Sequence, residues 1–77
     1  FRDVGWQLLR TSVYAERWNL VSRVLTNMPE LCEDERFRPM VEKKFNLIGP
    51  QATALAIEKM YSTSLDLQWL VHRWTLL

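Results

Sequence analysis

The chain has 77 residues, 48% of them hydrophobic, and its ten basic and nine acidic residues give a formal net charge of +1. This length accommodates one domain, and the hydrophobic fraction is too high for a disordered chain. A charge so close to zero argues against a protein dedicated to the phosphate backbone of nucleic acids.

Two glycines and three prolines are few for a many-stranded sheet, so we expect an all-α fold. We interpret residues 1–77 as a single helical domain or a fragment of a larger helical domain, because the apolar pattern continues to the last residue. No apolar run approaches the roughly 18–20 residues that span a bilayer, and no targeting leader is evident. We therefore expect an intracellular protein, cytoplasmic or nuclear, with no membrane partner.

Two amphipathic helices are expected before residue 29. Apolar residues of the first recur every three or four positions, at Phe1, Val4, Leu8, Leu9 and Val13. A second stripe comprises Trp18, Val21, Val24, Leu25 and Met28. One continuous helix through residue 28 is the alternative, but Thr11 and Ser12 lower helix propensity and favour two helices. Pro29 ends the second helix.

The central region is polar and then strongly periodic. Acidic residues precede basic ones, which favours a helix that begins near Glu33, with Pro39 either in a new first turn or at a kink. The stripe that follows comprises Phe37, Met40, Val41, Phe45 and Ile48. Gly49 and Pro50 are the clearest helix stop in the chain.

Two further helices are expected after Pro50. The first is rich in alanine, at Ala52, Ala54 and Ala56, and allows another helix to approach closely. A polar loop at 61–64 precedes a last helix that is apolar on two faces. The whole chain is therefore predicted to be a four- or five-helix bundle, or a pair of stacked helix hairpins.

Catalysis has little support in the sequence, and no cofactor or metal site is expected. Cys32 is the only cysteine, which excludes an internal disulfide and a thiolate zinc cluster, and a reduced thiol is expected. His72 is the only histidine and lies among apolar residues, where packing is commoner than catalysis. Cys32 and His72 could form a nucleophile–base pair, but the flanking residues show no third group that would orient the base. The chain also has no glycine-rich loop for phosphate binding.

The four tryptophans favour a surface for a partner protein or for self-association. Trp18 and Trp74 lie on stripes that a small core uses, whereas Trp6 and Trp69 lie off the main stripes. The partner-binding residues that we predict are Trp6, Trp69, Leu76 and Leu77, with Arg17 and Arg73 at the rim. The alternative is a nucleic-acid-binding helical module that uses Arg and Lys beside aromatic rings.

The segment from Trp6-Gln7-Leu8-Leu9 through Ala15-Glu16-Arg17-Trp18 to Leu25 and Pro29 resembles a helical hairpin of the tetratricopeptide type. The resemblance covers residues 1–29 and implies two packed antiparallel helices. The same region, together with Met28-Pro29-Glu30-Leu31, is also similar to the N-terminal helical docking domain of the shelterin bridging subunit. That similarity implies a nuclear scaffold. We predict a non-enzymatic adaptor or scaffold module.

Overall fold

The structure, a computed structural model, describes residues 2–61, which form three α-helices and one 3₁₀ helix. These elements are α1 (Arg2–Tyr14), α2 (Trp18–Asn27), η1 (Pro29–Glu33) and α3 (Phe37–Tyr61). No strand occurs among these residues, which confirms the all-α prediction. The count of four or five helices is not confirmed, because only three α-helices are found and the last predicted helix lies outside the described residues.

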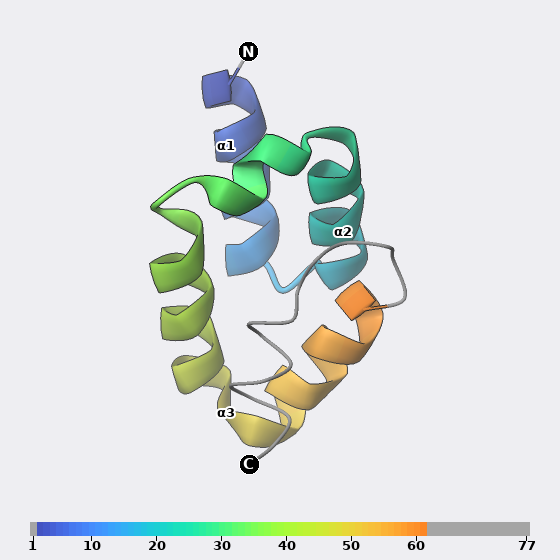
Figure 1. Cartoon of the computed structure of the whole chain (residues 1–77). Coiled ribbons are helices and arrows are strands. Elements are labelled where there is room, and N and C mark those ends of the chain that lie inside the picture. Colours follow the sequence, from blue (N-terminus) through green and yellow to red (C-terminus); the bar gives the residue numbers. More distant parts are fainter. Residues whose placement is uncertain (1, 62–77) are drawn as a thin grey trace.

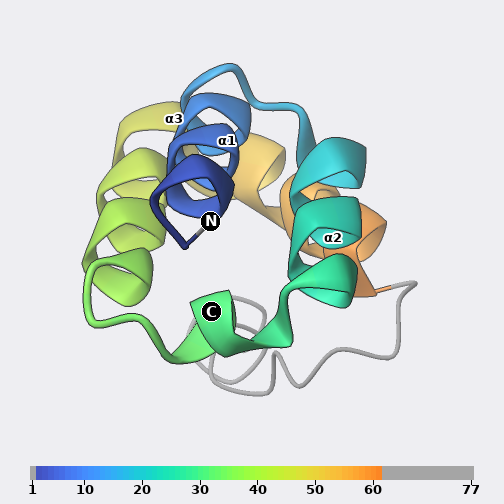
Figure 2. The same cartoon turned by 90° about the horizontal axis from the view of Figure 1, so that it is seen from above.

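The helices α1 and α2 form an antiparallel hairpin, and α3 bends around it (Figure 1). Seen from above, α1 lies between α2 and the first half of α3 (Figure 2). The short helix η1 crosses from the end of α2 to the start of α3. The second half of α3 turns back and packs against α2. The bend therefore lets a single long element contact both helices of the hairpin.

The turn between α1 and α2 confirms the prediction of two helices, not one, before Pro29. Glu16 has a φ of 56°, the left-handed conformation that ends many helices. The Arg17 amide donates to the Ser12 carbonyl and the Glu16 amide donates to the Val13 carbonyl, which is the Schellman pattern. Ser12 itself lies inside α1, so low helix propensity at residues 11 and 12 was the wrong reason for the break.

The polar centre folds differently from the expectation of a helix that begins near Glu33. Glu33 ends η1, and α3 begins only at Phe37. Between them, Asp34 Oδ1 accepts a hydrogen bond from the Arg36 amide at 2.9 Å. This side-chain bond stabilises a turn where the sequence pattern predicted helix. Pro39 falls in the first turn of α3, which was one of the two expected positions.

Gly49 interrupts α3 at the predicted position. Its φ of 89° and ψ of 172° are not helical, and Pro50 follows at once. The break leaves carbonyls at the end of the first half without their usual helical donors. Buried Thr53 supplies one donor, because its hydroxyl bonds the Phe45 carbonyl at 3.2 Å.

The core lies where the hairpin meets both halves of α3. Its fully buried side chains include Leu9, Leu25, Phe37 and Phe45. Trp18 is 5% exposed and packs against Phe45, with ring centroids 5.5 Å apart. The predicted stripes of α2 and of the first half of α3 are thus confirmed as core stripes, with Met28, Met40 and Ile48 packed at their edges.

The buried side of α1 differs from the predicted stripe. Leu9 and Val13 are buried as expected, but Val4 and Leu8 are exposed. The rest of the buried side consists of Gly5, Trp6 and Ser12. Gly5 leaves room for Met28 there, because a Cβ at this position would overlap the Met28 sulfur and the Met28 side chain would have to shift. The Ser12 hydroxyl is satisfied within the helix, since it donates to the Leu8 carbonyl at 2.7 Å.

Candidate functional site

A groove between α1 and α2 carries apolar side chains that the core does not bury. Its volume is about 170 Å³, and its lining residues are Leu8, Leu20, Arg23, Val24, Asn27 and Met28. Leu8 is 47% exposed, Leu20 and Met28 are half-buried, and Val24 forms part of the floor. We call this feature the α1–α2 groove. A groove of aliphatic side chains between two helices suits an apolar ridge of another helix.

The α1–α2 groove borders a wider hollow that is lined largely by polar and basic residues. This hollow, which we call the basic pocket, has a volume of about 410 Å³. It is lined by Glu16, Arg17, Trp18, Asn19, Leu20, Arg23 and Lys59. Leu20 and Arg23 line both features, so the pocket and the groove are parts of one continuous face.

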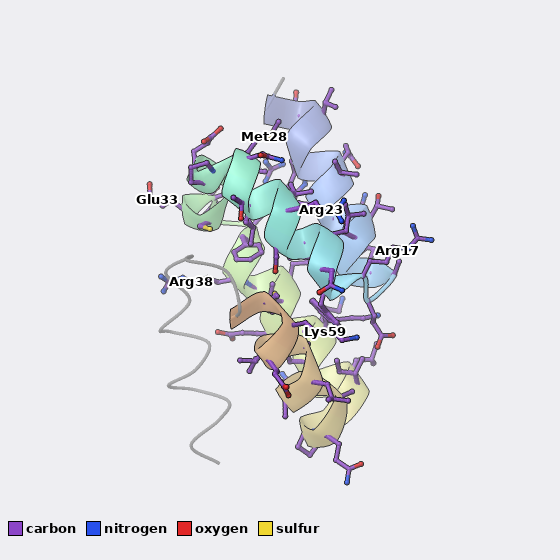
Figure 3. The ribbon with its side chains drawn as sticks, turned by 90° about the vertical axis from the view of Figure 1, so that its right-hand side faces the viewer. Arg17, Arg23, Met28, Glu33, Arg38 and Lys59 are labelled. Atoms are coloured by element: carbon purple, nitrogen blue, oxygen red, sulfur yellow. The ribbon has the colours of Figure 1, made fainter. Side chains whose placement is uncertain are left out.

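Two elements that are far apart in sequence position the cations of the basic pocket. Arg17 immediately precedes α2 and Arg23 lies in its middle, whereas Lys59 comes from the last turn of α3. Figure 3 shows this face, with Arg17 and Arg23 along α2, Lys59 on the half of α3 that packs below it, and Met28 at the far end. The bend at Gly49 is what carries Lys59 back to α2.

The charges around this pocket are unequally paired. Its one acidic residue, Glu16, forms an ion pair with Lys44 at 3.6 Å. The guanidinium groups of Arg17 and Arg23 have no ion-pair partner within residues 2–61. Both side chains are exposed, one just before α2 and one within it, so the face carries a local positive potential although the whole chain is nearly neutral.

A second apolar groove lies on the other side of α1, where it meets the first half of α3. We call it the α1–α3 groove; its volume is about 180 Å³ and its lining residues are Tyr14, Met40, Lys43, Lys44 and Leu47. Lys44 donates a hydrogen bond to the Tyr14 carbonyl at 2.9 Å and pairs with Glu16. This cation therefore joins the end of α1 to α3.

A third hollow, of about 260 Å³, lies at η1 and is lined by Cys32, Glu33, Asp34, Glu35 and Arg38. Nearby, Arg36 donates to both carboxylate oxygens of Asp34, at 2.9 and 2.7 Å. These hydrogen bonds raise the pKa of Arg36 above its ordinary value. Within residues 2–61, no three His, Cys, Asp or Glu side chains are grouped where they would hold a metal ion.

Trp6 is not on the surface where the sequence pattern placed it. Its side chain is only 7% exposed, and the Arg36 guanidinium carbon lies 4.2 Å from the centroid of its ring. The prediction of an exposed anchor at Trp6 is therefore wrong. The indole belongs to the core because α1 turns Gly5, Leu9 and Val13 inward beside it.

Arg17, a predicted rim residue, lines the basic pocket, which adjoins the α1–α2 groove. The predicted site residues Trp69, Arg73, Leu76 and Leu77 lie outside the described residues, as does His72. The sequence interpretation missed Leu8, Leu20 and Arg23 as surface residues of one face. The sequence pattern offers little indication of this surface, because Leu8 belongs to a stripe that was predicted to be core. Leu20 and Arg23 line the same groove only because α1 packs beside α2.

Comparisons with protein-family models, curated proteins and solved structures were made for the whole chain. None of them found a match. Among the residues that the structure describes, no helix is long and apolar enough to cross a membrane.

Proposed function

We propose that this chain is a non-enzymatic protein–protein interaction module of a larger adaptor or scaffold, and that it binds its partner through the α1–α2 groove. The observation that carries this proposal is the set of apolar side chains that lines a surface groove, from Leu8 on α1 to Leu20 on α2 and Met28 just beyond its end. Contiguous apolar surface rimmed by polar residues is characteristic of protein interaction sites.

Leu8 takes the place of Trp6 among the predicted anchors, and Arg17 stays at the rim. Trp69, Arg73, Leu76 and Leu77 remain predicted partner-binding residues, and the four- or five-helix bundle remains the proposed complete fold. An intracellular location also remains a prediction. The partner is another protein or a second copy of this chain. The mass of the chain in dilute solution distinguishes the two, because self-association gives a dimer.

The groove can be tested with a displayed library of helical peptides, about 18 residues long, selected for binding to the 77-residue chain. We expect the selected peptides to lose at least tenfold in affinity when Leu8 is replaced by Glu, because the apolar contact of Leu8 is lost and a charged group is placed where the apolar side of the peptide would pack. Leu55→Glu is the matched control, since Leu55 is an exposed leucine of α3 outside the groove. Binding that is insensitive to Leu8→Glu would contradict the proposal.

A nucleic-acid-binding module is the second candidate, and the basic pocket is the observation that favours it. Arg17, Arg23 and Lys59 line one hollow, and phosphate groups are bound by such cations. Its test is the affinity for a single-stranded oligonucleotide at 50 and 200 mM salt. A steep loss of affinity with salt that disappears in Arg23→Glu would support this candidate, and no binding at 50 mM salt would exclude it.

A further inference from the structure

We propose that the partner is an acidic amphipathic helix, bound with its apolar stripe in the α1–α2 groove and its acidic end over Arg17 and Arg23. This inference rests on the proposed function and adds the chemistry of the partner. Its basis is the continuity of two features: the basic pocket and the groove share Leu20 and Arg23 as walls.

The face is polarised along α2. Arg17 immediately precedes α2 and Arg23 lies in its middle, whereas Val24 and, just beyond the end of α2, Met28 line the groove together with Leu8. At 1.5 Å per residue, the distance from Arg17 to Met28 corresponds to about 16 Å, or roughly three helical turns. A bound helix of three to four turns therefore spans the face. Its acidic residues must lie at one end to meet the arginines while its apolar residues fill the groove.

The charge of the face selects an acidic occupant. Arg17 and Arg23 have no carboxylate partner within residues 2–61, and the carboxylate of Glu16 is engaged by Lys44. Arginine binds carboxylates through two parallel hydrogen bonds, which gives a docked Glu or Asp a defined position as well as charge. A basic helix would instead place like charges together, which lowers affinity and excludes such partners.

The apolar half of the face favours a helix over a nucleic acid. Phosphate binding needs several cations along a backbone, but the groove beyond Arg23 is lined by Leu8, Val24, Asn27 and Met28. Aliphatic side chains of a helix at i, i+3 or i+4, and i+7 fill such a groove. Met28 is suited to contact varied apolar residues, because its unbranched thioether adapts its shape.

The test uses three synthetic 18-residue peptides that are stapled to the same helix content. All three carry leucines at positions i, i+4 and i+7, and they differ only at three flanking positions at one end, which are Glu, Gln or Lys. We expect the Glu peptide to bind the 77-residue chain at least tenfold more tightly than the Gln peptide at 100 mM salt, by fluorescence anisotropy. The Lys peptide should bind most weakly.

Charge reversal on the protein provides the reciprocal experiment. The double variant Arg17→Glu with Arg23→Glu should lose at least tenfold in affinity for the Glu peptide and bind the Lys peptide better than the Glu peptide. The matched control reverses two cations outside this face, Arg10→Glu with Lys43→Glu, and should keep the preference for the Glu peptide. Both variants change the net charge by the same amount.

The outcomes separate this inference from the proposed function. Equal affinity for the Glu and Gln peptides, both lost in Leu8→Glu, overturns the acidic partner and leaves the interaction module standing. Binding that ignores Leu8 overturns both. The acidic helix is also overturned if no peptide binds but an oligonucleotide binds through Arg17 and Arg23. It is overturned as well if light scattering shows a dimer that dissociates in Leu8→Glu. If no peptide binds and Leu8→Glu destabilises the chain like a core substitution, the groove is not an open surface and the inference is wrong.

Discussion

The α1–α2 and α1–α3 grooves both combine apolar side chains with cations, but among the described residues only the α1–α3 groove has a cation, Lys44, that is engaged by the fold. In the α1–α3 groove, Lys44 bonds the Tyr14 carbonyl at 2.9 Å and pairs with Glu16. In the α1–α2 groove, Arg23 has no ion-pair partner within residues 2–61, and Arg17 stands next to it in the adjoining basic pocket.

This difference shows that similar surface composition serves two purposes. Lys44 is largely covered, with a side chain 12% exposed, and it connects the end of α1 to α3. Its charge is engaged by the fold itself and contributes to stability. The charges of Arg17 and Arg23 face solvent, so removing them would cost the fold little. Because the fold does not use these charges, they are available to bind a partner.

The largest expected effect concerns the core side of α1, which supports both grooves. Trp6→Ala removes a buried indole and should lower the free energy of unfolding by about 3–5 kcal/mol. Leu8→Ala, two residues away on the groove side, should lower it by less than about 1 kcal/mol. Urea denaturation followed by circular dichroism measures both. A similar loss in the two variants would mean that Leu8 is also core and that the α1–α2 groove is not a surface.

The contrast between Trp6 and Leu8 also shows where the sequence pattern misleads. Periodicity favoured Val4 and Leu8 because both are aliphatic, whereas the structure buries Gly5 and Ser12 on the same helix. Glycine has no side chain to register in an apolar stripe, and its burial reflects close approach of Met28. A serine hydroxyl that bonds its own helix loses little on burial, so hydrophobicity underestimates it.

Elements whose buried positions are mostly apolar were predictable from the chain alone. The stripes of α2 and of residues 37–48 in α3 match the core, and Gly49 ends the first half of α3 as expected. The α1–α2 face was not predictable, because Leu8 and Leu20 come from different helices and Lys59 joins them only through the bend at Gly49. Periodicity identifies the buried side of one helix but does not specify which exposed sides become neighbours.

The next largest effect tests the structural role of Lys44 directly. Lys44→Met keeps the methylene chain but removes the donor to the Tyr14 carbonyl and the ion pair with Glu16, so it should destabilise the fold by about 1 kcal/mol. Arg23→Met removes a cation of the other groove and should change stability by less than about 0.5 kcal/mol. Thermal unfolding of both variants gives the comparison. Equal losses would show that Arg23 is as structural as Lys44.

The inner side of α2 offers a smaller and opposite effect. Ser22 is 3% exposed, and its hydroxyl has no hydrogen-bond partner in the structure of residues 2–61. Ser22→Ala should therefore stabilise the fold by about 0.5–1 kcal/mol, because an unsatisfied buried hydroxyl is removed. Thr53→Val is the control, since its hydroxyl bonds the Phe45 carbonyl and its loss should destabilise. Loss of stability in Ser22→Ala would show that the hydroxyl has a partner.

The smallest effect concerns Glu16, which lines the basic pocket and also pairs with Lys44 of the α1–α3 groove. At a φ of 56°, a residue with a Cβ is strained by roughly 1–2 kcal/mol. Glu16→Gly relieves that strain, but it increases the entropy of the unfolded chain and removes an exposed ion pair, so a net stabilisation of about 0.5 kcal/mol is expected. Glu16→Gln keeps the strain and loses only the charge, so it should be slightly destabilised.

Both variants remove the acidic group of the basic pocket and should bind the acidic peptide about twofold more tightly, since like-charge repulsion disappears. Stability from urea denaturation and affinity from anisotropy thus separate the backbone role of Glu16 from its charge. If Glu16→Gly is less stable than Glu16→Gln, the left-handed turn is not the strained element, because relieving it would bring no gain.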